Sequence, residues 1–229
     1  MTTQPPSRGE VWVDHDGREV LVLSVDALNH GRMRDIVCLQ VEPGDQADDA
    51  ESPYALVVEV SMNGGVEERT IFLDELFLVA KEYLDRPVWV VPPDALEEAE
   101  SALEEILTPA AAPAGAPERP KGYPRPSEIR FADLRIPGEA EKPVVVVSSE
   151  AYGQLVGHAF VVACRVSSNS TTVREFEVKL RSQNGKVVCS HVQTVRLQDI
   201  TYRTTGGASH VTPGEADEIR RIVCSLLGL

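Results

Sequence analysis

Two stretches of the sequence decide how the chain is organised, VLVLSVDAL (Val20–Leu28) and VVVVSSEAY (Val144–Tyr152). Each contains four aliphatic residues, then serine, then a short segment with an acidic residue and alanine. A short aliphatic run bounded by polar residues is typical of a buried strand. The second stretch begins 124 residues after the first. The pair therefore raises the question of whether one fold is written twice.

Three further pairs of segments recur in the same order and at nearly the same spacing. Offsets of 125, 116 and 120 residues relate DIVCLQV (35–41) to FVVACRV (160–166), DELFLV (74–79) to SHVQTV (190–195), and the segments 91–107 and 211–227. Small differences between offsets are expected where loops gain or lose residues. Four matches in one order predict a tandem repeat.

A proline-rich segment separates the two copies. Residues 108–126 read TPAAAPAGAPERPKGYPRP, with six prolines and few residues to bury. Such a composition favours an extended, exposed linker. We therefore expect an acidic first domain at 1–108, a Pro/Ala-rich linker at 109–126 and a second domain at 127–229.

Each copy is predicted to be mainly β with a terminal helix, an α+β arrangement. The predicted strands are 9–14, 20–24, 36–41, 55–61 and 70–73 in the first copy, and 144–148, 160–164, 172–180 and 187–190 in the second, with 130–134 as a further candidate. Thr212 and Glu215 form a capping box for the last helix, whose apolar stripe is Ile219, Ile222, Val223 and Leu226. About five short strands with one helix indicate a small barrel-like sheet covered by that helix.

Charge is divided unequally between the copies. Residues 1–108 hold seven Lys and Arg against 24 Asp and Glu, a net charge of −17, whereas residues 109–229 hold 15 against 12. The acidic half repels a phosphate backbone.

The four cysteines are scattered without metal-site spacing, so reduced thiols and no cofactor are expected. No apolar segment is long enough for a membrane helix or a signal peptide, which predicts a cytoplasmic protein.

The segments RGEVWVD (8–14) and GREVLVLS (17–24) resemble the opening of the MazF/PemK (Kid/CcdB-like) toxins. In the second copy, EKPVVVVSS (141–149), VVCSHVQTVR (187–196) and the terminal helix are similar to later motifs of that family. The resemblance implies two SH3-like barrels, each with a C-terminal helix, fused in tandem as a pseudodimer. It also implies metal-independent cleavage of single-stranded RNA and an antitoxin partner.

The family's catalytic Arg and Thr map imperfectly onto this chain. The Arg position is Arg18 in the first copy and Lys142 in the second, and the Thr position falls on Val41 and Val166, with Ser167 next to the latter. RNA cleavage needs a base, an acid and a cation for the phosphorane charge. The candidate catalytic residues are therefore Arg18, Lys142 and Ser167, although Arg18 could instead pair with Asp14, Asp16 or Glu19.

A basic face on the second copy could contact a nucleic-acid backbone or the acidic first copy. Its residues are Arg165, Arg174, Lys179, Arg181 and Lys186. Two functions stay open: a catalytically weakened or silent relative that binds a partner protein or nucleic acid, and an active endoribonuclease of the mRNA interferase type. A third reading is that the acidic copy mimics RNA or an acidic antitoxin tail. The copies could pair within one chain, as a monomer or a homodimer.

Overall fold

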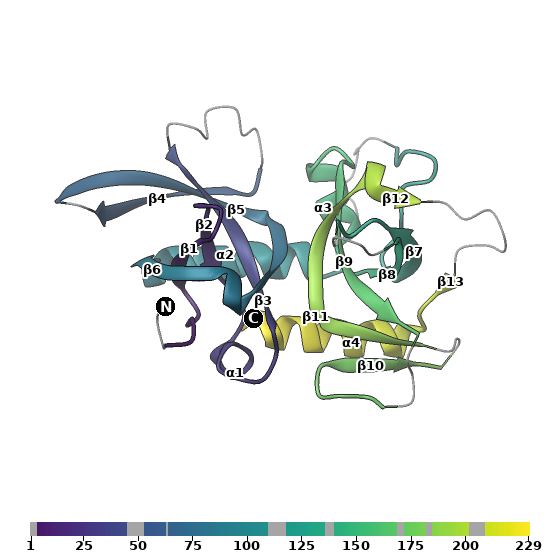
Figure 1. The fold of residues 1–229 in the computed structure, drawn as a ribbon. Coiled ribbons are helices and arrows are strands. Elements are labelled where there is room, and N and C mark those ends of the chain that lie inside the picture. The colour runs from purple at the N-terminus through teal and green to yellow at the C-terminus, as the bar shows by residue number, and fades with distance from the viewer. Residues whose placement is uncertain are drawn as a thin grey trace. The chain divides into compact units, whose positions relative to one another are not determined.

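A computed structural model describes residues 4–44, 53–62, 64–109, 118–135, 140–168, 172–181, 185–201 and 209–229. The chain forms two compact units (Figure 1). Unit 1 comprises Met1–Glu104 with Ser225–Leu229, and unit 2 comprises Glu105–Cys224. The unit boundary therefore lies inside the helix that ends the first copy, and the last five residues of the chain group with unit 1.

Unit 1 is an antiparallel six-stranded sheet with helices. Its strands are β1 (Glu10–Asp14), β2 (Glu19–Val22), β3 (Asp35–Pro43), β4 (Ala55–Met62), β5 (Gly65–Ala80) and β6 (Leu84–Val90), in the order β4-β5-β3-β2-β1-β6. A one-turn helix α1 (Asp26–Asn29), a 3₁₀ turn η2 (Lys81–Tyr83) and the long helix α2 (Pro93–Leu107) complete it.

Unit 2 contains the corresponding elements in the same order. Its strands are β7 (Glu128–Ala132), β8 (Lys142–Val146), β9 (Phe160–Ser167), β10 (Glu177–Leu180), β11 (Gly185–Arg196), β12 (Ile200–Thr201) and β13 (Ser209–His210). The strand order is β10-β11-β9-β8-β7-β12, with β13 also pairing with β7. The helices are α3 (Glu150–Leu155) and α4 (Pro213–Leu227), with a 3₁₀ turn η3 (Leu197–Asp199).

The stretches Val20–Leu28 and Val144–Tyr152 each contain a serine that makes the same pair of hydrogen bonds. The backbone N–H of Ser24 donates to the Val37 carbonyl (3.2 Å), and the Val37 N–H donates back to Ser24 Oγ (3.2 Å). Ser148 and Val162 repeat both contacts, at 3.2 and 3.1 Å. In each unit a serine hydroxyl thus satisfies a buried backbone donor where the strand leaves the sheet.

The strand registers correspond as well. Leu21 of β2 lies opposite Leu39 of β3, and Val145 of β8 lies opposite Cys164 of β9. In both units the register then shifts at the next step, after Leu39 on β5 and after Cys164 on β11. Such a shift bends the strand and increases its twist.

Each unit has its own apolar core. In unit 1 it contains Trp12, Val20, Val22, Ile36, Cys38, Val79 and Leu84. In unit 2 it contains Tyr123, Ala132, Val144, Val146, Val161, Ala163, Val195 and Ile200. The mainly β class with terminal helices is therefore confirmed.

Most predicted strands are present, but their lengths differ from expectation. β5 joins the predicted strand 70–73 to the following segment, and β11 does the same for 187–190. Strand β6, which the sequence analysis missed, contains Pro87, a residue that argues against a strand interior. The predicted strand 172–180 begins only at Glu177, because residues 175–176 form a turn in which Glu177 Oε2 accepts from Arg174 N (2.7 Å).

The capping box of the last helix is confirmed. Glu215 N donates to Thr212 Oγ1 (3.3 Å), and Thr212 N donates to Glu215 Oε2 (2.8 Å). Arg181 N also donates to Glu215 Oε1 (2.6 Å). Burial alone would raise the pKa of Glu215, but these hydrogen bonds outweigh burial and lower the pKa below its ordinary value.

The end of the predicted linker is exposed only in part, and one of its side chains packs into unit 2. Residues 110–117 lie outside the described residues, but Tyr123 is buried in the core of unit 2. Its hydroxyl donates to the Phe160 carbonyl (2.7 Å), and its ring packs edge-on against His158 at 4.6 Å between centroids. A Cβ at Gly153 would come within 2.5 Å of the Tyr123 hydroxyl, so this close contact requires glycine.

None of the four cysteines forms a disulfide, and Cys38, Cys164 and Cys189 are buried. Burial raises the pKa of each of these three thiols, to about 12 for Cys189. Within the described ranges, none of the helices is long and apolar enough to cross a membrane.

Candidate functional site

Arg18 lies in a turn that already supplies its counter-ions. The turn joins β1 to β2, and Gly17 takes a positive φ of 83° there. The Asp14 carboxylate accepts from Arg18 Nε (2.8 Å) and contacts Nη2 (2.7 Å), while Asp16 contacts Nη2 at 3.2 Å. Of the three partners proposed from the sequence, Arg18 therefore uses Asp14 and Asp16, and Glu19 points elsewhere.

The turn is built around Asp14 rather than around a ligand. Asp14 is buried, and its second oxygen accepts from the backbone N–H groups of Asp16 and Arg18, at 2.9 Å each. The Arg18 side chain is 66% exposed, but two carboxylates share its single positive charge. A phosphate approaching Arg18 would meet a net negative turn.

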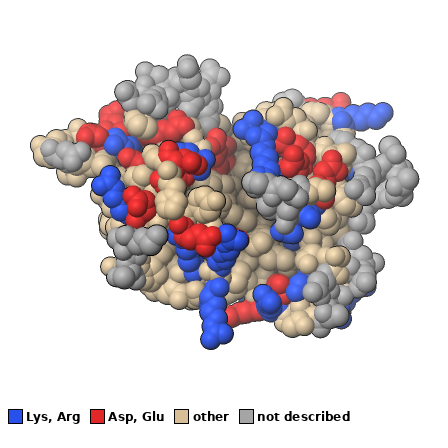
Figure 2. All heavy atoms as spheres, viewed as in Figure 1, with Lys and Arg blue, Asp and Glu red and all other residues tan. Residues whose placement is uncertain are grey.

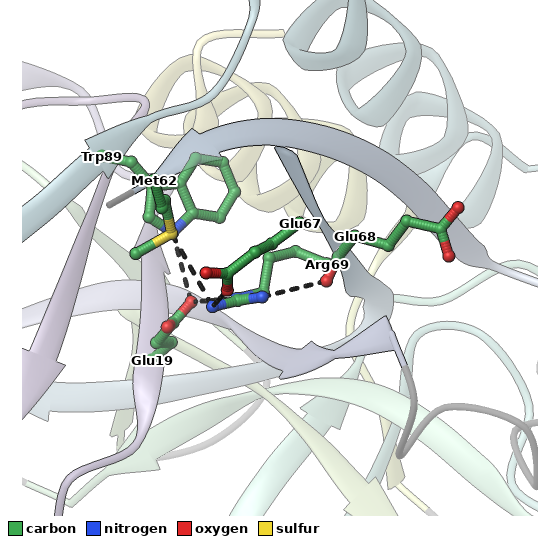
Figure 3. Close-up of polar contacts among 6 residues, drawn as sticks. All are labelled: Glu19, Met62, Glu67, Glu68, Arg69 and Trp89. Carbon is green, nitrogen blue, oxygen red and sulfur yellow. Dashed lines mark hydrogen bonds and ion pairs between the residues drawn. The ribbon is translucent and has the colours of Figure 1, made fainter. Parts of the chain in front are cut away.

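Glu19 takes part in a second cluster, which Figure 3 shows in close-up. Glu19 Oε2 accepts from Arg69 Nε (3.1 Å) and from Trp89 Nε1 (3.2 Å). Arg69 Nη2 donates to Glu67 Oε2 (2.9 Å) and lies 3.7 Å from the sulfur of Met62. The cluster thus joins β2 to the three consecutive strands β4, β5 and β6, and its central pair, Glu19 and Arg69, is 50 residues apart in the sequence.

Arg69 is an almost buried cation with both charge partners in place. Its side chain is 9% exposed and that of Glu19 is 17% exposed. Burial alone would lower the pKa of Arg69, but hydrogen bonds to Glu19 and Glu67 outweigh it and raise the pKa above the ordinary value. The guanidinium therefore forms ion pairs with two carboxylates of unit 1, and these hold it in place.

In unit 2 the strand register brings Ser167 to one level of the sheet with two lysines. Ser167 lies opposite Lys186, and Lys186 lies opposite Lys179. Residues directly opposite on antiparallel strands share one face, so this row combines two amines with one hydroxyl. Lys142 lies opposite Ala132 of β7, and the pairing of β8 with β9 ends at Val144 opposite Arg165, two residues short of Lys142.

Lys186 is engaged within unit 2. Its ammonium group contacts Glu177 Oε2 at 2.8 Å and donates to the Thr172 carbonyl at 2.6 Å. The side chains of Lys186 and Glu177 are 8% and 10% exposed. Lys186 is thus a buried ion-pair partner and is not presented to solvent.

The other members of the proposed basic face differ in exposure. Arg174, Lys179 and Arg181 are exposed, and Arg165 is half-buried. On the face drawn in Figure 2, Lys and Arg side chains of the described residues lie beside Asp and Glu side chains rather than in one continuous basic stripe.

No group of three or more His, Cys, Asp and Glu in the described ranges could hold a metal ion. The sequence analysis missed the Arg69 cluster. The available signal was Glu19, a charged residue that begins an otherwise apolar strand, together with the glutamates that precede Arg69.

Comparison with known proteins gives one sequence match. Residues 125–227 match the family described as PemK-like, MazF-like toxin of type II toxin-antitoxin system. No curated protein matches the chain.

Several solved structures have similar parts. An endoribonuclease in complex with its cognate antitoxin from Mycobacterial species is 24% identical, over 46% of this chain and 96% of that chain, with a TM-score of 0.38. MazE–MazF (Form-III) from Deinococcus radiodurans is 23% identical, over 47% and 98%, with a TM-score of 0.39. The structural likenesses concern the fold alone, and the sequence match identifies residues 125–227 as similar to the PemK-like, MazF-like toxin family.

Proposed function

We propose that the chain is a divergent tandem MazF/PemK-like protein that is catalytically weakened or silent and binds a partner protein or nucleic acid. Residues 1–108 and 127–229 would be two SH3-like barrel domains, joined by the linker at 109–126 and paired within one chain as a pseudodimer. The proposal includes a cytoplasmic location, no cofactor, and an antitoxin or another protein as a possible partner.

The duplication is supported by matched details in both units. The strand orders β4-β5-β3-β2-β1-β6 and β10-β11-β9-β8-β7-β12 correspond element by element. Ser24 and Ser148 make the same pair of backbone contacts, and the register shifts occur at equivalent steps. Matching side-chain contacts are harder to obtain by chance than matching strand number.

The proposed loss of activity rests on the ion pairs that Arg18 forms with Asp14 and Asp16. A catalytic arginine must offer its donors to a phosphate, whereas the Arg18 guanidinium is bound by Asp14 and Asp16. Glu19, directly beside it, adds a third carboxylate that is held by Arg69. Releasing Arg18 for a phosphate would leave the buried Asp14 without its cation, which opposes binding.

Unit 2 offers weaker versions of the required groups. Lys142 keeps a positive charge but lacks the bidentate fork of arginine. Val166, at the position expected for the hydroxyl, is buried in the sheet. These features support weakened catalysis at this position as well.

The alternative is an active, metal-independent endoribonuclease that uses Arg18, Lys142 and Ser167. Continuing the β8–β9 register two residues beyond Val144↔Arg165 would set Lys142 level with Ser167, and a cation and a hydroxyl on neighbouring strands could contact one phosphate. Unit 2 is also the part of the chain that matches the toxin family.

Incubation with mixed-sequence RNA in the presence of EDTA separates the two candidates. If the chain is catalytically silent, we expect no cleavage of the RNA and no growth arrest of cells that express the chain. Cleavage that disappears in Lys142→Ala or Arg18→Ala, but persists in the surface control Arg32→Ala, would establish the nuclease instead. Recovery of neither protein nor nucleic acid in pull-downs would contradict the binding role.

Nucleic-acid binding can be tested with variants of the basic face. We propose that Arg165, Arg174, Lys179 and Arg181 supply the contacts of the basic face, with Lys186 held in its ion pair. Arg174→Ala with Arg181→Ala should weaken RNA binding and reduce its salt dependence by about two counter-ions. An unchanged affinity in that variant would exclude this face.

A further inference from the structure

The β4–β5 hairpin of unit 1 is longer than its counterpart in unit 2. Residues of β4 and β5 pair from Ala55↔Phe72 to Met62↔Gly65. In unit 2 the pairing of β10 and β11 runs from Glu177↔Val188 to Leu180↔Gly185. This last pair, Leu180↔Gly185, corresponds to Val58↔Arg69 of unit 1. The pairs from Glu59 to Met62 are therefore an extension, and Figure 1 shows it projecting beyond the other strands of unit 1.

One face of the β4–β5 hairpin is buried and the other carries exposed valines. On the buried face, Val58 and Val60 are 6% and 5% exposed. On the opposite face, Val57 and Val66 are 58% and 68% exposed. Two exposed β-branched residues on one hairpin face present an apolar surface without a cover among the described residues.

Between these valines lies a pair of like charges. Glu59 of β4 and Glu68 of β5 lie directly opposite each other, and both are exposed. Facing carboxylates on neighbouring strands repel one another. Within the described ranges, no Lys or Arg side chain forms an ion pair with either glutamate, whereas Glu67 on the other face is bound by Arg69.

The backbone of β4 is also open to pairing. It is the outermost strand of the unit 1 sheet, so one of its edges has no neighbouring strand in the described part of the chain. Edge strands accept an additional strand through their main-chain groups, and side chains on alternate positions then give specificity.

We propose that β4 is a docking edge for an extended, basic segment of a partner protein, which adds to the sheet as a further strand. Lys or Arg side chains of that segment would neutralise Glu59 and Glu68, and its apolar side chains would cover Val57 and Val66. The net charge of −17 in residues 1–108 favours the approach of a cationic partner. The inference rests on the proposed binding role and names its surface and its partner chemistry.

The test uses the full-length chain and a short fluorescein-labelled peptide of repeated Val-Ser-Lys-Ser, measured by fluorescence anisotropy. In this peptide Val and Lys alternate at every second position, so both lie on the same face of the added strand. A peptide of equal charge with Pro at alternate positions controls for attraction without strand addition, because Pro lacks the main-chain donor. The alternating peptide should bind at least about tenfold more tightly than the Pro peptide.

Two charge-reversal variants locate the surface. Glu59→Lys/Glu68→Lys should weaken binding of the alternating peptide by about tenfold. Glu98→Lys/Glu104→Lys, which makes the same change of net charge on exposed positions of α2, should change it less than about twofold. Far-ultraviolet circular dichroism of both variants checks that the fold is retained.

Several results would overturn the proposal: equal binding of both peptides, equal losses in both variants, no binding, or displacement of the peptide by single-stranded RNA. Self-association of the chain through this edge, seen by analytical ultracentrifugation and lost in Glu59→Lys/Glu68→Lys, would also overturn it. RNA cleavage measured on the same samples reports separately on the proposed loss of activity.

Discussion

Replacing Arg69 with methionine tests whether the Arg69 cluster is a structural ion pair. Arg69→Met keeps most of the side-chain volume but removes the donors to Glu19 Oε2 (3.1 Å) and Glu67 Oε2 (2.9 Å). Glu67 is 42% exposed and can be rehydrated, whereas Glu19 is 17% exposed and keeps only the Trp89 indole donor. The variant therefore leaves one carboxylate poorly solvated.

The expected loss follows from that geometry. Removing one partner of a buried ion pair costs about 3–5 kcal/mol, and partial exposure of Glu19 sets the estimate at about 3 kcal/mol. Glu19→Gln should cost only about 1 kcal/mol, because the amide oxygen still accepts from Arg69 and Trp89. The double variant Arg69→Met/Glu19→Leu should lose less than the sum, with a coupling of about 2 kcal/mol.

Urea unfolding followed by tryptophan fluorescence measures these losses in unit 1 alone, since both tryptophans, Trp12 and Trp89, belong to it. With a slope of about 2 kcal/mol per molar urea, Arg69→Met should lower the midpoint by about 1.5 M. Arg34→Met is the matched control: Arg34 pairs with Glu82 where both side chains are more than half exposed, so no measurable shift is expected. Additive losses in the cycle, or an unchanged midpoint in Arg69→Met, would refute the reasoning.

Four further predictions concern the cap of α4, a buried histidine and the thiols. Thr212→Ala should destabilise α4 by about 1 kcal/mol, measured as faster amide hydrogen exchange in that helix. The pKa of Glu215 is lowered from 4.5 in the folded state, so its contribution to the free energy of unfolding is present above pH 4.5 and is lost as the pH falls below it. Glu215→Gln should make stability less dependent on pH in this acid range. An unchanged pH dependence of stability would contradict the cap. Burial and the nearby Arg119 lower the pKa of His158 from 6.5, although Glu150 opposes this shift. The free energy of unfolding should therefore decline as the pH falls below 6.5, with faster amide hydrogen exchange in residues 118–126. His158→Asn should remove the decline, because Asn tolerates the local φ of 60°. Of the four thiols, a disulfide-exchange reagent should modify Cys224 under native conditions and the other three only after unfolding, and rapid modification of all four would show that the burial is wrong.

Predictions from the sequence were correct where the local structure depends on residues a few positions apart. The capping box of Thr212 and Glu215 depends on residues three positions apart, and it formed as predicted. The buried alternation of Val178 and Leu180 also follows from the period of a strand, although the strand itself starts late. Pro87 concealed β6, because proline argues against a strand unless it lies near an edge.

The candidate site could be predicted only in part. The sequence indicated that Arg18 has acidic neighbours, and the structure selects Asp14 and Asp16 from them. The sequence included Lys186 in an exposed basic face, but its ammonium group is buried against Glu177. That difference arises because the turn before β10 folds the Thr172 carbonyl and the Glu177 carboxylate toward β11.

The sequence by itself determined where most of the strands and the last helix lie along the chain, because each apolar run, its terminal serine and the capping box depend on residues a few positions apart. Only the tertiary structure decided which charges meet. Arg69 reaches Glu19, 50 residues earlier, through strand pairings on β2, β3 and β5 whose register includes a bulge. A one-residue change in that register would turn either side chain to the opposite face, so charge pairing of this kind is fixed by the assembled sheet.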